Sequence, residues 1–316
     1  MKTSAPHLDA WRISLVALLT AASLLLPSVA AGYGWPVKPF DQQHPVRGFF
    51  GDPRIDDRDR SGSLHFGVDV VAANGTPVFS TLTGRVTIDP RRGSTVTVAA
   101  GGHVFEYWHV VPAVRSGQWA EAYRTVVGRV EAPWAHVHLA ECLGGRYVNP
   151  LRAGGLSPFA DRTRPEAGSV TAERGGRPLA VAALSARIDI VAEVRDWMPV
   201  AAPAPWTGKP VMPALVRWRL VGSRSRTAWR TAFDVRTSLP SCGFAGVYAQ
   251  WTRQNKPWRA GRYRVYLARN LDTRALADGR YRVEVEATDT HGNSDRRATV
   301  VVIRNAAAAP NLAAVR

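Results

Sequence analysis

Two neighbouring runs, Thr95-Val96-Thr97-Val98-Ala99 and Val104-Phe105-Glu106-Tyr107-Trp108-His109-Val110, determine the kind of fold that the sequence predicts. Both runs are rich in β-branched and aromatic residues, and the pair Gly101-Gly102 lies between them. Runs of this composition, bounded by turn-forming residues, are typical of short antiparallel strands rather than of helices. We therefore expect two adjacent strands here.

The same alternation of apolar runs and turn signals extends from Gly34 to about Leu151. A further run at Arg85–Ile88 follows the Gly84 turn, and Pro90 and Gly93 separate it from the next. The segment from Ser116 to Tyr123 is the only one in this half that favours a helix, and its signal is weak. The first half of the chain is thus predicted to be all-β and mainly antiparallel.

Beyond a Gly-, Pro- and Ser-rich stretch at 153–168, which we interpret as a linker, the strand signals become more regular. Apolar residues alternate along four segments: Ile188, Ile190, Ala192 and Val194; Val216, Trp218 and Leu220; Tyr263, Val265 and Leu267; and Tyr281, Val283, Val285 and Ala287. Half-buried strands at this spacing predict an immunoglobulin-like β-sandwich over residues 169–305. The proline-rich stretch 199–214 is expected to be a long surface loop of this sandwich, or else a boundary between two subdomains.

The N-terminal residues 1–30 have the pattern of a secretory signal peptide. Lys2 and Arg12 precede an apolar run from Ile13 to Leu26, and small residues at Pro27–Ala30 suit a cleavage site. The run is shorter than the ~20 residues of a membrane span. We expect an exported protein, in the periplasm, cell wall or extracellular space, without a membrane span after cleavage. An uncleaved N-terminal anchor is the alternative, and the Ala-rich tail at 306–316 is expected to be disordered.

The positive charge is concentrated in the second half of the chain. Residues 166–316 contain 24 Lys and Arg against 12 Asp and Glu, whereas residues 31–165 contain 15 against 12. This excess suits a polyanionic surface such as cell-wall polymer, anionic lipid or nucleic acid, but high arginine usage and solubility explain it equally well. The two cysteines, Cys142 and Cys242, could form a disulfide in an oxidising compartment or remain free.

Two short histidine motifs suggest a metal site. In a strand, His136 and His138 would point to the same face, and neutral imidazole is a common zinc ligand. If His65-Phe66-Gly67-Val68-Asp69 is extended, His65 and Asp69 also share a face. Two ligands from this segment and one from the histidine pair would give a His2Asp site whose fourth position is open for water, as a hydrolytic zinc centre requires. Each motif alone is a weak signal.

Together with His109 at the end of the aromatic run, these motifs resemble the lysostaphin-like (LytM-type) zinc metallopeptidases, which cut peptide bonds in bacterial peptidoglycan. The resemblance covers roughly residues 46–152. It extends to the flanking segments Gly51–Arg54, Gly67–Ala72, Gly75–Val78, His138–Glu141 and Val148–Leu151. The stretch Ile55–Arg60 departs from the family pattern as an insertion.

The resemblance implies a peptidase domain at 31–152 that binds one zinc ion per chain. It implies that His65, Asp69 and His138 are the ligands and that His109 and His136 are the non-ligand catalytic pair. His136 would pass the proton of the attacking water to the leaving amine, and His109 would stabilise the developing oxyanion. Cys142 is not expected to be a ligand, because a thiolate would close the open position.

These observations predict an exported, monomeric zinc endopeptidase whose partner is peptidoglycan rather than nucleic acid, with the basic second half holding it to the wall. Two alternatives remain. A protein of the same fold could bind peptidoglycan or activate another hydrolase without catalysis, although members of that kind usually lack a metal ligand. The metal site could also act on peptides outside the wall.

Overall fold

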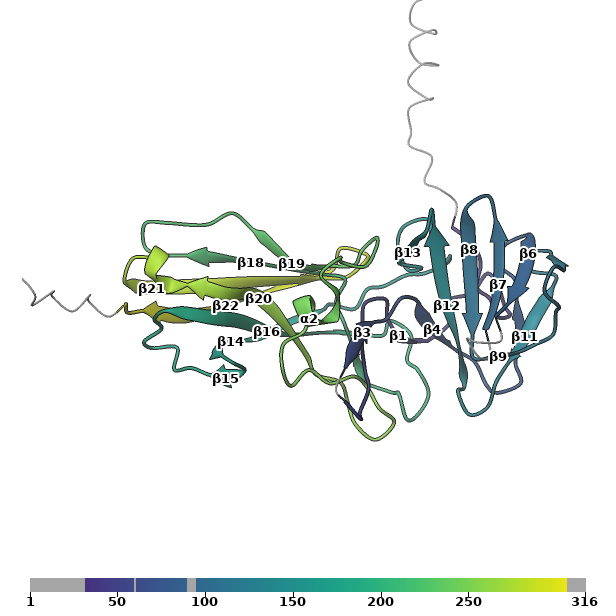
Figure 1. Cartoon of the computed structure of the whole chain (residues 1–316), viewed down its shortest axis with the longest axis horizontal. Coiled ribbons are helices and arrows are strands. Elements are labelled where there is room, and N and C mark those ends of the chain that lie inside the picture. The colour runs from purple at the N-terminus through teal and green to yellow at the C-terminus, as the bar shows by residue number, and fades with distance from the viewer. Residues whose placement is uncertain (1–31, 60, 90–94, 306–316) are drawn as a thin grey trace, which may run out of the picture. The chain divides into compact units, whose positions relative to one another are not determined.

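Strands make up nearly all of the regular structure in the computed structural model, which describes residues 32–59, 61–89 and 95–305 (Figure 1). Within these ranges, the helical elements are α2 (Gly243–Val247) and the single 3-10 turn η2 (Thr273–Ala275). Leaving isolated bridges aside, the ladders between the named strands are antiparallel in both halves of the chain. The predicted all-β class is therefore confirmed. The predicted signal peptide and the predicted disordered tail lie outside the described residues.

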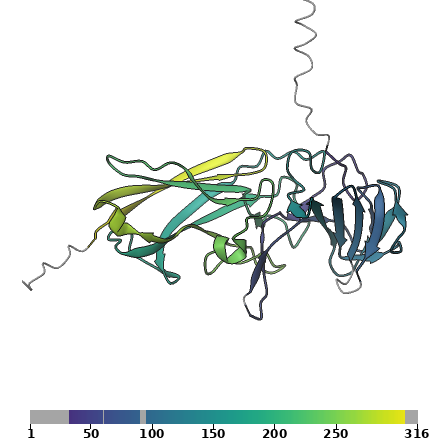
Figure 2. The same cartoon turned by 45° about the horizontal axis from the view of Figure 1, so that its top comes forward.

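The described residues of the first half form three sheets from thirteen strands. An eight-stranded sheet has the order β1-β4-β12-β8-β7-β6-β10 with β13 paired to β12, and β5-β11-β9 form a second sheet. β2 and β3 form a separate hairpin, the purple ribbon that projects from the rest in Figure 2. The strands are β1 (Val46–Gly48), β2 (Pro53–Ile55), β3 (Gly62–Leu64), β4 (Val68–Val71), β5 (Pro77–Phe79), β6 (Gly84–Ile88), β7 (Thr95–Ala100), β8 (His103–Trp108), β9 (Val110–Pro112), β10 (Trp119–Ala120), β11 (Val126–Val130), β12 (His136–Leu143) and β13 (Arg146–Val148).

The runs at 95–99 and 104–110 form the adjacent strands β7 and β8, as predicted. Gly101 and Gly102 both have positive φ in the turn between them. The helix predicted at 116–123 is wrong. Its residues form turns around the two-residue strand β10, which pairs with β6. One reason is local, because Gly117 has a φ of 85°, in the left-handed region. The other is tertiary, because the N–H of Gly117 donates to the carbonyl oxygen of Val86 instead of to a helical partner.

The second half forms two antiparallel sheets. One has the order β15-β14-β16-β17 with β20 also paired to β16, and the other has the order β19-β18-β21-β22. The strands are β14 (Glu166–Arg174), β15 (Arg177–Pro178), β16 (Arg187–Trp197), β17 (Pro210–Val211), β18 (Leu215–Val221), β19 (Arg230–Asp234), β20 (Tyr263–Asp272), β21 (Gly279–Thr288) and β22 (Ser294–Ile303). The predicted alternating residues of β16, β18, β20 and β21 are buried. The immunoglobulin-like assignment stays a prediction.

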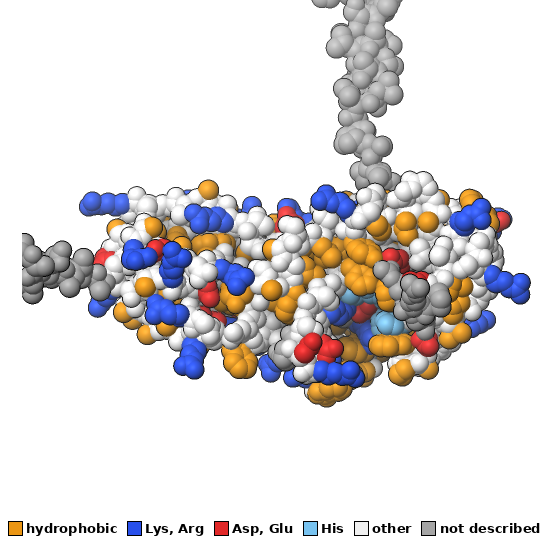
Figure 3. Space-filling model, viewed as in Figure 1, with side chains coloured by type: hydrophobic (Ala, Val, Ile, Leu, Met, Phe, Trp, Pro, Cys, Tyr) orange, Lys and Arg blue, Asp and Glu red, His pale blue; other side chains and the backbone are white. Residues whose placement is uncertain are grey.

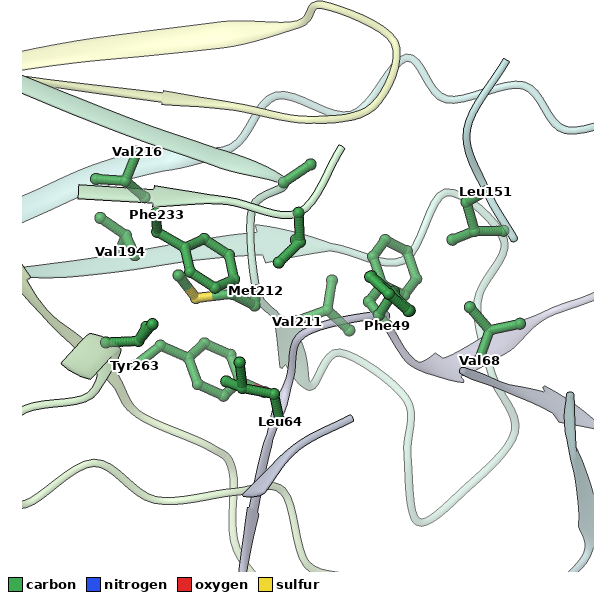
Figure 4. Packing of buried hydrophobic residues seen from close by; sticks show 14 of the residues in the cluster. Phe49, Leu64, Val68, Leu151, Val194, Val211, Met212, Val216, Phe233 and Tyr263 are labelled. Atoms are coloured by element: carbon green, nitrogen blue, oxygen red, sulfur yellow. The ribbon is translucent and has the colours of Figure 1, made fainter. Parts of the chain in front are cut away.

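Residues 199–214 are not a surface loop throughout. The segment ends in β17, which pairs with β16, and the side chains of Val211 and Met212 are fully buried. Figure 4 shows Met212 next to Phe233, with Val211 and then Phe49 farther along the same cluster, so residues from both halves pack in one core. The described residues from Gly32 onward belong to a single compact unit, and the predicted division into two domains stays a prediction.

Two further features bear on the sequence predictions. Cys142 and Cys242 are free thiols, so of the two possibilities the structure has the unpaired one. Among the described residues, no helix has the length and apolar character needed to cross a membrane.

Candidate metal centre

His65 and Asp69 come together across a bend rather than along one extended segment. β3 ends at Leu64 and β4 begins at Val68, so the residues between them belong to neither strand. The bend needs glycine at position 67, because a Cβ there would lie 2.4 Å from the backbone oxygen of Leu139. His65 and Asp69 share a face as expected, because the bend at Gly67 brings this segment close to β12.

β12 supplies the histidine pair. His138 lies directly opposite Asp69 in the β4–β12 ladder, and His136 lies opposite Val71. Because side chains at i and i+2 of a strand share a face, both imidazoles point to the Asp69 side of the sheet, as predicted. The Oδ1 atom of Asp69 is 3.2 Å from Nδ1 of His138 and 3.4 Å from Nε2 of His136.

Three potential ligand atoms converge at this point. Nε2 of His65 is 2.7 Å from Nδ1 of His138 and 3.1 Å from Oδ1 of Asp69. The three side chains are buried, and their ligand atoms all lie within 4.8 Å of one another. Two imidazole nitrogens and one carboxylate oxygen form a donor set that zinc prefers. The His65-Asp69-His138 group could therefore hold a metal ion. Cys142, further along β12, is not part of the group.

The environment of the two histidines favours their neutral, metal-binding form. Nδ1 of His65 lies 2.8 Å from the carbonyl oxygen of Phe49, to which it can donate, and this leaves the Nε2 lone pair directed at the group. Burial, followed by the charge of Arg54, lowers the pKa of His65 to about 3, and burial also lowers the pKa of His138. Nδ1 of His138 is the better placed of its two nitrogens, because it is the one that faces Nε2 of His65 and Oδ1 of Asp69. Its Nε2 has no hydrogen-bond partner in the described residues.

Asp69 is held from its other side by a guanidinium. Arg54 donates to Oδ2 of Asp69 at 2.8 Å, which leaves Oδ1 facing the imidazoles. Burial alone would raise the pKa of Asp69, but the facing histidines and Arg54 outweigh it and hold this pKa well below its ordinary value. Gly48 lies opposite Asp69 in the β1–β4 ladder, and a Cβ there would be 2.5 Å from Oδ2. The carboxylate is thus fixed on two sides.

His109 reaches the group through an unusual backbone conformation. It follows β8 with a φ of 62°, in the left-handed region that costs a non-glycine residue about 1–3 kcal/mol. Its ring stacks on Trp134 at 4.0 Å between centroids and lies 4.8 Å from the ring of His136. Burial and then His136 lower the pKa of His109 to about 3. The structure thus places His109 and His136 together, beside the three potential ligands.

His136 is buried between two polar neighbours that compete for one nitrogen. Its Nδ1 is 2.7 Å from the carbonyl oxygen of Trp134 and 2.8 Å from a guanidinium nitrogen of Arg47. An Nδ1–H group can donate to the carbonyl, but then it cannot accept from Arg47. The carbonyl is fixed in the backbone, whereas the guanidinium can turn on a long side chain. We therefore assign the proton to Nδ1, which leaves the Nε2 lone pair of His136 toward the cavity.

The group opens into a cavity of about 420 Å³ that is lined by both halves of the chain. Figure 3 shows histidine side chains in a hollow of the surface with acidic and basic side chains beside them. The second half contributes Trp206, Tyr263 and the segment 254–257. The ring of Trp206 lies 4.2 Å from the guanidinium carbon of Arg47, and Nζ of Lys256 pairs with Asp57 at 2.9 Å.

Several of the residues that surround the candidate metal centre have no role predicted from the sequence. Trp134 could have been found from its position two residues before His136. Arg54 lies in a segment that was quoted for the family resemblance, but its contact with Asp69 could not be derived from spacing. Arg47 and Trp206 carry no sequence signal, because they meet only through the tertiary fold.

No family model matches the chain, and no curated protein matches it. A solved structure titled "A Novel M23 Metalloprotease Pseudoalterin from Deep-sea" is similar over 47% of this chain and 94% of that chain, with 18% sequence identity and a TM-score of 0.29.

Proposed function

We propose that the chain is a zinc-dependent endopeptidase that is exported and hydrolyses peptide bonds in bacterial peptidoglycan. The observation that carries the proposal is the convergence of His65 Nε2, Asp69 Oδ1 and His138 Nδ1 in a cavity that also contains His109 and His136. The motifs that resemble lysostaphin-like peptidases supply the substrate class. We further propose one zinc ion per chain, a monomeric state, and an immunoglobulin-like second domain at 169–305.

Zinc held by these three side chains would act as a Lewis acid and would lower the pKa of a bound water to about 7. The remaining chemistry belongs to the chain itself. Nε2 of His136 is unprotonated when Nδ1 donates to Trp134, and it lies 3.5 Å from the Arg47 guanidinium and 3.4 Å from Oδ1 of Asp69. It is placed to take a proton from water and return it to the leaving amine. His109, fixed by its stack on Trp134, is neutral at pH 7 and can donate one hydrogen bond to a developing oxyanion.

Arg47 supports a substrate that carries a carboxylate. Among the described residues, no ion pair joins Arg47 to an acidic side chain, and its guanidinium lines the cavity against the Trp206 ring. Burial lowers its pKa, so a substrate carboxylate would bind it with less competition from water than at an exposed site. The stem peptides of peptidoglycan carry free carboxylates close to their peptide bonds, which fits this requirement.

The decisive experiment combines metal analysis with product identification. Purified zinc-loaded protein is expected to contain one zinc per chain and to release peptides from sacculi, and mass spectrometry of these products names the bond that is cut. His65→Ala and His138→Ala should lose both the zinc and the release. His44→Ala is the matched control, because His44 is a histidine that contacts the carbonyl of Pro39 outside the cavity. Digestion by either ligand variant at the wild-type rate would contradict the proposal.

A non-catalytic protein that binds peptidoglycan or activates a hydrolase remains the competing function. It would be favoured by protein that lacks stoichiometric zinc yet still sediments with sacculi. A comparison of sacculi with an unstructured protein substrate separates the peptidoglycan hydrolase from a general peptidase, because only the latter would digest both at similar rates.

A further inference from the structure

A second cluster of potential ligands lies in the other half of the molecule. Asp161 precedes β14, Asp196 is in β16 next to its final residue, and Asp289 begins the turn from β21 to β22. Their carboxylates approach so that one oxygen from each lies within 4.8 Å of the others. The three side chains are 5%, 1% and 3% exposed, so water reaches none of them freely.

Local hydrogen bonds fix these carboxylates but do not neutralise them. The Oδ1 atom of Asp161 accepts from Thr163, that of Asp196 accepts from the N–H of Trp197, and Asp289 accepts from the turn residues His291 and Asn293. The Oδ2 atoms of Asp161 and Asp196 are buried and have no hydrogen-bond partner in the described residues. No ion pair of the described residues joins any of the three to Lys or Arg.

This arrangement is costly unless a positive charge is added. Each carboxylate repels the other two, because their oxygens lie within 4.8 Å of one another and burial weakens the screening by water. Burial, followed by the charges of Asp161 and Asp289, raises the pKa of Asp196 to about 8. Either protons or a cation must compensate the repulsion. A proton shared between the Oδ2 atoms of Asp161 and Asp196 would partner both atoms but leave two negative charges on the cluster, whereas a divalent cation would contact all three carboxylates and offset two of their three charges.

The space and the ligand type indicate which cation would fit. A cavity of about 10 Å³ is lined by Asp196 and Asp289 together with Phe49, Asn149 and Met212, whereas Asp161 approaches these two carboxylates from outside its lining. This volume is close to that of a single water or ion. Three carboxylates offer up to six hard oxygen ligands, the number at which calcium coordination begins, and calcium tolerates irregular and bidentate geometry. Magnesium demands octahedral geometry and retains several waters, for which the cavity has little room.

We propose that Asp161, Asp196 and Asp289 form a binding site for a hard divalent cation of the calcium class. The ion would link three segments of the second half that are distant in sequence: the approach to β14, the end of β16 and the β21–β22 turn. Because Phe49 of the first half lines the same cavity, the site lies where the two halves of the chain pack together. Its role is structural, and it does not depend on the peptidase function.

The test is thermal unfolding of the full mature chain as calcium is added. The protein is dialysed against calcium-free buffer that keeps zinc constant, so the first metal centre does not change. Calcium at a hundredfold excess over its dissociation constant is expected to raise Tm by about 5 °C or more. Magnesium should give a smaller rise. A Tm that is unchanged by either ion but falls between pH 7 and 9 would show a shared proton instead and would overturn the proposal.

Variants locate the ion. Asp196→Asn and Asp289→Asn keep the side-chain shape and should abolish the calcium-dependent rise in Tm. The control Asp234→Asn should keep it, because Asp234 pairs with Arg236 and is not one of the three cluster carboxylates. Terbium is a second probe, since Trp197 next to Asp196 can sensitise its emission. Calcium should displace that emission in the wild type, and it should be absent from Asp196→Asn. A calcium response that persists in both cluster variants would place the ion elsewhere and refute the site.

Discussion

Replacement of Gly48 by alanine is expected to weaken zinc binding without unfolding the protein. Gly48 faces Asp69 across the β1–β4 ladder, and a Cβ at this position would be 2.5 Å from Oδ2 of Asp69 and 2.7 Å from a guanidinium nitrogen of Arg54. To restore a separation of about 3 Å, the carboxylate must withdraw by about 0.5 Å, whereas metal–ligand distances tolerate about 0.2 Å. The strain of such overpacking is typically about 1–3 kcal/mol.

If this strain acts mainly on the metal-bound geometry, zinc affinity should fall by about 5- to 150-fold, since each 1.4 kcal/mol is a factor of ten. The measurement is competition for zinc against a chromophoric chelator, with circular dichroism as the check on folding. Gly102→Ala is the control. Gly102 has a φ of 79° in an open turn, so alanine there costs stability but touches nothing near the metal centre. A folded Gly48→Ala protein with wild-type zinc affinity would refute the reasoning.

Three other substitutions test separate parts of the structure. Asp52→Ala removes a buried carboxylate that accepts hydrogen bonds from two backbone N–H groups, one from each half of the chain. It should lower the free energy of unfolding by about 2–4 kcal/mol in a urea titration. The control Asp56→Ala, at an exposed position, should change this free energy by less than about 0.5 kcal/mol. His136→Ala should retain one zinc per chain by elemental analysis yet lose about 10²–10⁴ in kcat, so loss of the zinc would contradict its proposed role as a base. Arg47→Gln should raise KM about tenfold for a peptide with a free carboxylate and leave KM for the amidated peptide almost unchanged, and an equal effect on both peptides would exclude the proposed contact.

The strands could be predicted because their signal is local. The alternation of β16 and β21 matches a side-chain period of two, and the glycine pair between β7 and β8 marks a turn. The failures have non-local causes. Residues 116–123 pair with β6 instead of forming a helix, and the end of the 199–214 stretch is buried by residues that are far away in sequence.

The candidate site could be predicted from the sequence only to the level of its histidines and Asp69. The i, i+2 spacing of His136 and His138 fixes their shared face in any strand, so that inference is independent of the rest of the fold. The pairing of His65 with Asp69 was expected from an extended segment, but it results from a bend at Gly67. The side chains that surround these residues meet through tertiary contacts, which one sequence does not encode in any local pattern.

The second half of the chain helps to form the cavity, which is a role beyond that of holding the protein to the wall. The N–H of Met212 donates to Asp52, whose backbone oxygen accepts from the N–H of His65, so a short chain of bonds joins the second half to a proposed ligand. Met212 also lines the small cavity beside Asp196. An ion at the aspartate cluster would therefore stiffen the packing that positions Asp52. We infer that the cavity is complete only when the two halves pack together. Loss of this packing would impair the peptidase site even though the three proposed ligand side chains would still be present.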